Sequence, residues 1–297
     1  MESTLPTRKH SGLSLRTIAG VFKLRIGVVI TFTALAGLAV SGGPALSLAQ
    51  TVILTLAVLI SSASAGAFNQ FVEADSDRLM ARTRSRAFAS GALPRSFGWL
   101  LVIVALLVFA VSMAAWVVNL SAAGFVLLGA LTYAGVYTLG LKRRTPWNIV
   151  IGGLAGSFAV LAGAAAVNPQ VGPLALLLAL VLFLWTPPHF WSLAIANQSQ
   201  YAAAGVPMLP VVVGAARAAR IVHGSTVALV AVSLLPVFFG AGWIVFAGAL
   251  AGGVHFLRKT HALARQPSRQ TAMAAFFASM VQLSALLAAV VIDAALR

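Results

Sequence analysis

Apolar residues along this chain come in long continuous runs that are separated by short polar or basic stretches. A run of about 18 or more apolar residues is long enough to cross a bilayer as a helix. Strands of a transmembrane barrel would instead alternate apolar and polar residues with a period of two. The pattern predicts an all-α polytopic membrane protein with nine transmembrane helices, at roughly 20–41, 46–70, 97–118, 121–140, 148–167, 172–196, 220–240, 241–257 and 271–295.

The composition supports this prediction. Of the 297 residues, 60% are hydrophobic and only 8% are charged, which is too few charges for a soluble domain of this size. The chain has no cysteine, which excludes disulfides, thiolate nucleophiles and sulfur-ligated metals. No linker-like segment divides the apolar runs. The sequence therefore predicts a disordered cytoplasmic tail at residues 1–16 and a single membrane domain at residues 17–297.

Charge is distributed unevenly between the two sides of the predicted bundle. The chain carries 20 Lys and Arg against 5 Asp and Glu, and 19 of the 20 basic residues precede or open the first span or follow an even-numbered one. Cytoplasmic loops of membrane proteins carry such an excess. We therefore expect the inner (cytoplasmic) membrane, with the N-terminus in the cytoplasm and the C-terminus on the opposite side. The net charge of +15 then reflects topology and attraction to anionic membrane lipid rather than binding of nucleic acid.

Three of the five acidic residues stand together in the stretch NQFVEADSDRLMARTRSR, which begins at Asn69. Asn69, Glu73 and Asp77 are spaced four residues apart, so a helix that continues through them aligns all three on one side. Asp75 is rotated by about 200° from that line. Carboxylate and amide oxygens are the ligands that Mg²⁺ prefers. The candidate metal ligands are therefore Asn69, Glu73 and Asp77, with Asp75 as a less central member.

Arginines follow the acids directly, at positions 78, 82, 84 and 86. Guanidinium groups match phosphate oxygens in a bidentate manner. Acids that hold a cation beside cations that hold an anion describe a site for Mg²⁺ and a phosphate group. The alternative is that the acids and arginines only neutralise one another on a solvated loop. The concentration of acids at this one loop, out of all the basic loops, favours the binding site.

The motif N-x-x-x-[DE]-x-D-x-D-x-x-M-x-R-T-x-x-R at 69–86 resembles the first aspartate-rich motif of the UbiA superfamily of intramembrane prenyltransferases. Its M-A-R-T segment is similar to that of the superfamily members that farnesylate heme. So are the stretches LKRRTPWNIVIGGLAGS at 141–157, FLWTPPHFWSLAIA at 183–196 and YAAAGVPMLPVV at 201–212. The resemblance extends over roughly residues 20–290, and it implies a UbiA-type bundle of nine helices.

The resemblance also implies a reaction that uses one or two Mg²⁺ ions. Farnesyl diphosphate loses its diphosphate, the C2 vinyl group of heme b attacks the allylic cation, and water captures the resulting charge to give heme O. A heme A synthase or a terminal oxidase is the expected recipient of the product. By match to the motif, the catalytic metal-diphosphate residues are Asn69, Glu73 and Asp77. The expected diphosphate contacts are Arg82, Arg86, Lys142, Arg143 and Arg144.

The second long loop departs from the family pattern. Heme-farnesylating members generally carry an acid directly before the tyrosine of Y-x-x-A-G-x-P-M-L-P, whereas here Gln200 precedes Tyr201 and the loop has no carboxylate. Gln200 and Tyr201 stay candidate site residues through their neutral oxygens. The departure predicts one tightly held Mg²⁺ or weaker binding of a second ion, and it leaves an inactive paralogue open.

His189 lies within the sixth predicted span, beside two prolines. An ionisable residue at membrane depth is a functional candidate, and heme iron favours imidazole. We expect His189 to approach the heme at its iron or at a propionate, with a structural histidine as an equal alternative. Trp185, Phe190 and Trp191 are candidates for a prenyl cavity in which aromatic faces stabilise the cation. Packing or interfacial anchoring is their alternative role.

Three other functions stay open at this point. One is a UbiA-type transferase acting on a different lipid acceptor, and another is a non-catalytic heme-binding assembly paralogue. The third is a secondary transporter for an anionic substrate. Transporters usually place their substrate site near the bilayer midplane. The charged cluster of this chain is predicted at one membrane face instead, which favours the enzyme.

Overall fold

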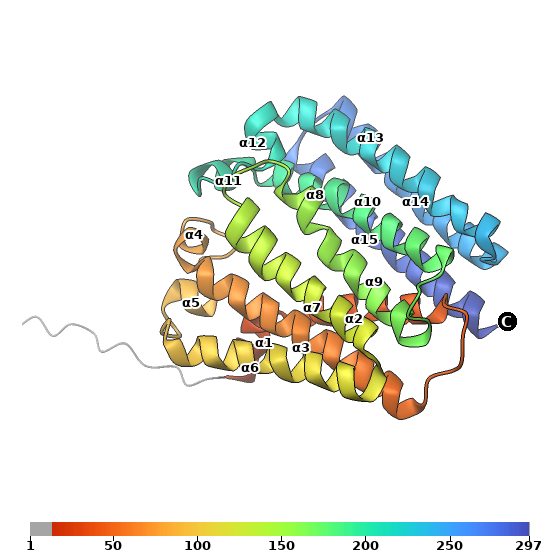
Figure 1. Ribbon diagram of the computed structural model, residues 1–297. Coiled ribbons are helices and arrows are strands. Elements are labelled where there is room, and N and C mark those ends of the chain that lie inside the picture. Colours follow the sequence, from red (N-terminus) through yellow and green to blue (C-terminus); the bar gives the residue numbers. More distant parts are fainter. Residues whose placement is uncertain (1–13, 297) are drawn as a thin grey trace, which may run out of the picture.

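Helices make up the whole architecture of the computed structural model, which describes residues 14–296 and contains no strand in that range (Figure 1). The helices that run through the bundle are α2 (Leu24–Ala39), α3 (Leu48–Val72), α6 (Phe97–Met113), α7 (Leu120–Leu131), α9 (Leu154–Val167), α10 (Pro173–Ala196), α13 (Ala215–Leu234), α14 (Trp243–Arg265) and α15 (Arg269–Ala295). Shorter helices are α1 (Leu15–Val21), α4 (Ala74–Arg78), α5 (Ala87–Ser90), α8 (Asn148–Gly152), α11 (Gln198–Ala203) and α12 (Leu209–Val213). Helices α4, α5, α11 and α12 gather at one end of the bundle (Figure 1).

The long helices identify the chain as a multi-pass membrane protein. Within residues 14–296, seven helical segments are long and apolar enough to cross a membrane, and the bent pair α1 and α2 adds an eighth. The run predicted at 241–257 forms α14, which is not among them because its last turns carry Arg258, Lys259 and Arg265. The all-α membrane fold is confirmed, and the ninth span stays a prediction. Most of the predicted tail at 1–16 lies outside the described residues, and α1 begins at Leu15.

The first predicted span, at 20–41, contains a break near its start. The chain bends by 53° between α1 and α2. Lys23 lies at the break and adopts the left-handed conformation, with φ 49°, which costs a non-glycine residue about 1–2 kcal/mol. The break turns the Lys23 ammonium toward polar side chains of the bundle. A charged group inside a membrane domain needs such partners.

Glycines allow the closest helix contacts. A Cβ built on Gly163 of α9 would overlap the carbonyl oxygen of Ala34 in α2, and one on Gly37 of α2 would overlap that of Val160 in α9. Small residues let helix backbones approach closely in membranes, where van der Waals packing rather than the hydrophobic effect drives association. The pair Gly37 and Gly163 therefore sets the spacing of α2 and α9.

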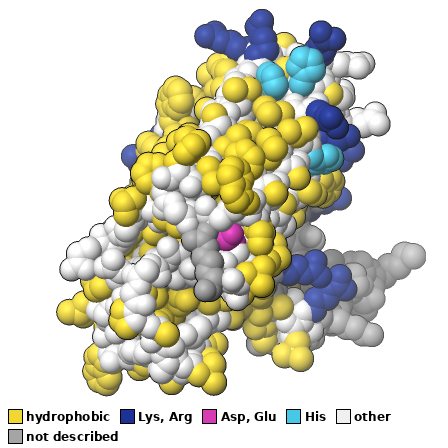
Figure 2. All heavy atoms as spheres, turned by 90° about the vertical axis from the view of Figure 1, so that its right-hand side faces the viewer, with side chains coloured by type: hydrophobic (Ala, Val, Ile, Leu, Met, Phe, Trp, Pro, Cys, Tyr) yellow, Lys and Arg dark blue, Asp and Glu magenta, His cyan; other side chains and the backbone are white. Residues whose placement is uncertain are grey.

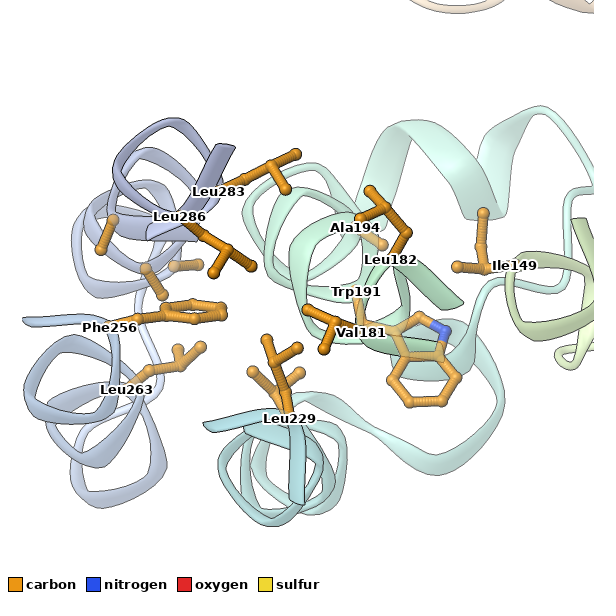
Figure 3. Close-up of a cluster of buried hydrophobic side chains, with 14 of the residues drawn as sticks. Ile149, Val181, Leu182, Trp191, Ala194, Leu229, Phe256, Leu263, Leu283 and Leu286 are labelled. Atoms are coloured by element: carbon orange, nitrogen blue, oxygen red, sulfur yellow. The ribbon is translucent and has the colours of Figure 1, made fainter. Parts of the chain in front are cut away.

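A second packed region joins α10, α13, α14 and α15. Figure 3 shows side chains from these four helices pointing into one shared interior. The members that are at most 5% exposed include Val181, Leu182, Trp191, Leu229, Phe256, Leu263, Leu283 and Leu286. This packing fixes α10, which carries His189, against α15.

The third and fourth spans end in wider helical turns. A π-helical segment, η1 (Ala114–Val118), extends α6, and a longer one, η2 (Thr132–Leu141), extends α7. A short 3₁₀ segment, η3 (Leu235–Phe239), extends α13. In η2 the Lys142 N–H donates to the carbonyl oxygen of Tyr137 at 2.9 Å. Wider turns of this kind frequently mark functional sites because they redirect side chains, and η2 carries tyrosines that face the acidic motif.

Candidate active site

The predicted acidic group forms where α3 ends and α4 begins. Asn69, Glu73 and Asp77 are 2%, 2% and 1% exposed. Although α3 ends at Val72, backbone bonds with four-residue spacing continue across the junction. The Glu73 N–H donates to Asn69 O at 3.0 Å, and the Asp77 N–H donates to Glu73 O at 2.8 Å. The three side chains therefore stay on one line, as the spacing predicts.

Each member of this group accepts a hydrogen bond from a cationic side chain. The Lys23 ammonium donates to Asn69 Oδ1 at 2.6 Å, and the Lys142 ammonium donates to Glu73 Oε2 at 2.5 Å. Arg86 donates to Asp77 Oδ2 at 2.8 Å. Buried carboxylates need partners of this kind, because an unpaired buried charge is strongly unfavourable. The group therefore combines three cationic side chains with two carboxylates and one amide.

One carboxylate oxygen is left over. Asp77 Oδ1 is buried and has no hydrogen-bond partner among residues 14–296. A buried acceptor without a partner costs on the order of 1–3 kcal/mol, and more when it is charged. The donor set of two carboxylates and one amide oxygen is the hard-oxygen set that suits Mg²⁺. The residues present therefore fit a divalent cation, although no group of three or more His, Cys, Asp or Glu that could hold a metal occurs in the described range.

Asp75 is not brought to this group. Its side chain is 61% exposed and accepts two hydrogen bonds from Arg95, at 2.9 and 3.2 Å. Arg78 lies 3.4 Å away as a second partner. The rotation of about 200° per two helical residues explains why Asp75 faces away from Asp77.

The predicted basic residues surround the acidic group in different ways. Arg86 and Lys142 pair with the acids, and Arg143 donates to the Ser76 hydroxyl at 3.0 Å. Arg82 reaches the second long loop, where its guanidinium lies 3.5 Å from the Tyr201 hydroxyl and its backbone N–H lies 3.5 Å from Gln200 Oε1. Arg144 is exposed on the loop that carries Lys142. The two long loops therefore meet at Arg82.

Sequence reasoning missed four residues of the site, which are Lys23, Tyr133, Tyr137 and Thr138. Lys23 also donates to the Tyr133 hydroxyl at 3.1 Å, and Asn69 Nδ2 donates to the Thr138 hydroxyl at 3.0 Å. The rings of Tyr133 and Tyr137 stack at 5.5 Å, with the Lys23 and Lys142 ammonium groups 5.5 and 5.6 Å from their respective ring centres. A lysine inside an apolar run was a usable signal for Lys23. For the tyrosines the signal was rarity, since the chain has only three.

His189 lies in an aromatic stack between α10 and α15. Its Nδ1 is 2.6 Å from the Ser279 hydroxyl, and its ring stacks on Trp185 at 4.1 Å and on Phe276 at 4.5 Å. Trp185 donates to the Ser279 carbonyl oxygen at 2.8 Å. These contacts connect His189 to α15 and not to the acidic group. They fit the structural alternative, and the heme role stays a prediction.

The other two aromatic candidates have different surroundings. Phe190 is 37% exposed, whereas Trp191 is 3% exposed and belongs to the packed region of α10, α13, α14 and α15. The buried Trp191 indole nitrogen has no hydrogen-bond partner within residues 14–296. Trp185 and Phe190 both contact the His189 ring, whereas Trp191 packs in the interior of the bundle, and the cavity role of the three stays a prediction.

Comparison with known proteins places the chain in a defined family. Residues 30–281 match the model of the UbiA prenyltransferase family. "Protoheme IX farnesyltransferase 2" of Paramagnetospirillum magneticum is 54% identical over 280 residues, which cover 94% of this chain and 97% of that protein. A solved structure concerned with digeranylgeranylglyceryl phosphate synthase superposes with a TM-score of 0.77 at 17% identity, covering 94% of this chain and 98% of the other. A UbiA homolog from Archaeoglobus fulgidus bound to DMAPP and Mg²⁺ gives 0.73 at 14% identity, covering 91% and 99%.

Proposed function

The chain belongs to the UbiA prenyltransferase family, and we propose that it transfers the farnesyl group of farnesyl diphosphate to the C2 vinyl group of protoheme IX, with addition of water, to give heme O. The observation that carries the choice of acceptor is the 54% identity, over 94% of the chain, to a relative named protoheme IX farnesyltransferase. The buried group of Asn69, Glu73 and Asp77 supports the diphosphate chemistry, because it combines hard-oxygen ligands with adjacent cations.

Asn69, Glu73 and Asp77 would hold Mg²⁺. Asp77 Oδ1 has no hydrogen-bond partner within residues 14–296, so an ion could bind it without displacing another group. When bound, the ion supplies positive charge that stabilises the departing diphosphate. We propose one ion. The group offers only two buried carboxylates, and the facing loop contributes the neutral Gln200 near Arg82.

The cations of the site have a second role in this proposal. Without diphosphate, Lys142 and Arg86 neutralise Glu73 and Asp77, with 14% and 25% of their side chains exposed. With the acids occupied by a metal, the same ammonium and guanidinium groups are free to turn to phosphate oxygens. Arg82, Arg143 and Arg144 supply further charge at the mouth of the site. These donors then stabilise the negative charge that develops on the leaving diphosphate.

The stacked rings of Tyr133 and Tyr137 border this charged layer on the bundle side. Aromatic faces stabilise a nearby cation through their π electrons. We propose that these rings shield the allylic cation until the heme vinyl group reaches it. Trp185 and Trp191 are proposed to line the path of the prenyl chain, and His189 to approach the heme through the ring nitrogen that Ser279 does not bind.

We propose nine membrane spans, which are the eight long apolar segments described above and α14, the eighth in chain order. Its 23 residues extend over about 34 Å, enough to cross the hydrocarbon of a bilayer. We further propose that the N-terminus and the acidic group lie on the cytoplasmic side of the inner membrane and the C-terminus on the opposite side, which the distribution of basic residues supports. The product keeps an apolar farnesyl tail, so handover to a heme A synthase or terminal oxidase would proceed within the membrane.

Heme analysis tests the reaction directly. The chain is expressed in cells that lack their own heme O synthase, and extracted hemes are identified by mass. We expect a heme that carries a hydroxyethylfarnesyl group, and we expect it to be lost in Asp77→Asn. If only heme b is found while the folded protein is present in the membrane, heme is not the acceptor. Extracted lipids from the same cells are then searched for another prenylated product.

A further inference from the structure

We propose that the start of α13 and the end of α14 form a binding site for the headgroup of an anionic phospholipid, separate from the proposed transfer reaction. The two helices run antiparallel, so these ends lie together. Figure 2 shows Lys, Arg and His side chains gathered at the upper end of the molecule. The exposed members of this rim cluster are Arg217, Arg220, Arg258, Lys259, His261 and Arg265.

The cations of the rim cluster have no acidic partner in the described part of the chain. The four ion pairs found within residues 14–296 all use Glu73, Asp75 or Asp77, far away in the sequence. The one acid on α13, α14 or α15 is Asp293, near the opposite end of α15. Five positive charges therefore face outward on two adjacent helices without a counter-charge. Such a surface attracts an anion at the membrane interface.

The same helix faces become apolar one to two turns further from the rim. Val227 of α13 is 49% exposed, and Leu250 and Val254 of α14 are 41% and 36% exposed. A ligand with an anionic head and acyl chains contacts both the cations and this apolar surface. A free phosphate uses the cations alone. The continuity of the two surfaces is our reason for choosing a lipid.

The spacing across the rim is fixed by contacts between the helices. His223 Nδ1 of α13 lies 3.1 Å from the Thr260 hydroxyl of α14, and the rings of His223 and His261 are 5.4 Å apart. A Cβ on Gly253 of α14 would lie 2.7 Å from a methyl group of Val230, so the helices are in close contact. Arg220 and Lys259 are therefore held on a rigid pair and not on a loop. This rigidity is what separates a binding site from diffuse surface charge.

The test uses the full-length protein in detergent micelles with added phosphatidylglycerol or phosphatidylcholine. Retained lipid is counted by native mass spectrometry, and the unfolding midpoint is followed with each lipid and with inorganic phosphate. Arg220→Gln combined with Arg258→Gln removes two rim charges. Arg16→Gln combined with Arg25→Gln removes two exposed charges from α1 and α2 as the matched control.

We expect the wild type and the control pair to retain phosphatidylglycerol in preference to phosphatidylcholine. The rim pair should retain about 25-fold less phosphatidylglycerol, because it removes two charges and each interfacial charge contributes about fivefold. Equal loss in both pairs would mean diffuse attraction, and a midpoint raised equally by phosphate would mean a free-anion site. Either result overturns the proposal, as does unchanged retention in the rim pair. If the rim pair does not fold, the exposed single change Lys259→Gln is used instead, with an expected loss of about fivefold in retained phosphatidylglycerol.

Discussion

Asp75 and Asp77 are two residues apart and lie in opposite surroundings. Asp77 is 1% exposed with one oxygen unpartnered in the described range, whereas Asp75 is exposed and paired with Arg95. We expect Asp77→Asn to lower the rate of farnesyl transfer on the order of 100-fold and to raise the Mg²⁺ concentration that the reaction needs. Asp75→Asn should change both by less than about twofold. Transfer rates measured across a Mg²⁺ titration decide this, and equal effects of the two changes would refute the assignment.

Lys23 is the residue that connects the bent first span to the acidic motif. Its ammonium donates to both Asn69 and Tyr133. Replacing it by methionine leaves these groups without their cation and removes a positive charge from beside the proposed diphosphate position. We expect Lys23→Met to lower kcat/KM for farnesyl diphosphate at least about tenfold.

Arg25→Met is the matched control for this change, because Arg25 is exposed two residues further along the chain, in the first turn of α2. Steady-state kinetics of both variants against farnesyl diphosphate separate the two positions. A loss in Arg25→Met as large as in Lys23→Met would mean that the effect comes from net charge and not from the contact with Asn69.

Helix α9 offers a test of how closely its glycines must pack. Gly163 meets the α2 backbone, whereas a Cβ added to Gly156 on the same helix meets open space. Gly163→Leu forces the two backbones apart, and overpacking of this kind costs about 1–3 kcal/mol or more. Gly156→Leu should cost much less. Thermal unfolding in detergent measures the difference, and equal midpoints for the two variants would show that α2 and α9 are not held by this contact.

The absence of cysteine makes the membrane topology of the whole chain directly measurable. Single cysteines at Gln266, between α14 and α15, and at Phe239, before α14, are expected to react with impermeant reagents from opposite sides of the membrane. A third cysteine at Gln170, between α9 and α10, should behave like the one at Phe239. All three positions are exposed. Labelling of intact cells and inverted vesicles gives the result, and the unmodified chain is the background control.

Labelling of Gln266→Cys and Phe239→Cys from the same side would exclude α14 as a span and leave eight. The unfavourable feature of α14 is its basic final turns. Long basic side chains near a helix end reach the interface, however, while their apolar stems stay in the bilayer. The basic final turns are the reason why length and composition alone do not count α14 among the spans, although α14 packs beside α13 and α15 (Figure 1).

The sequence by itself determined the class of fold and the location of the acidic group. Uninterrupted apolar runs must form helices in lipid, because no solvent is present to satisfy the backbone. Four-residue spacing must align Asn69, Glu73 and Asp77, because the helical period is local. The resemblance to the UbiA superfamily rested on short motifs, and it is confirmed by the family match over residues 30–281.

Only the tertiary structure decided which side chains meet. Lys23 reaches Asn69 across 46 positions and Tyr133 across 110, and Lys142 reaches Glu73 across 69. Periodicity describes neighbours within one helix and contains nothing about contacts at such separations. Neither the bend at Lys23 nor the wide turns of η2 contains a proline. These two departures from a regular helix bring Lys23 and Tyr133 beside the acidic group, and the helical period does not specify such contacts.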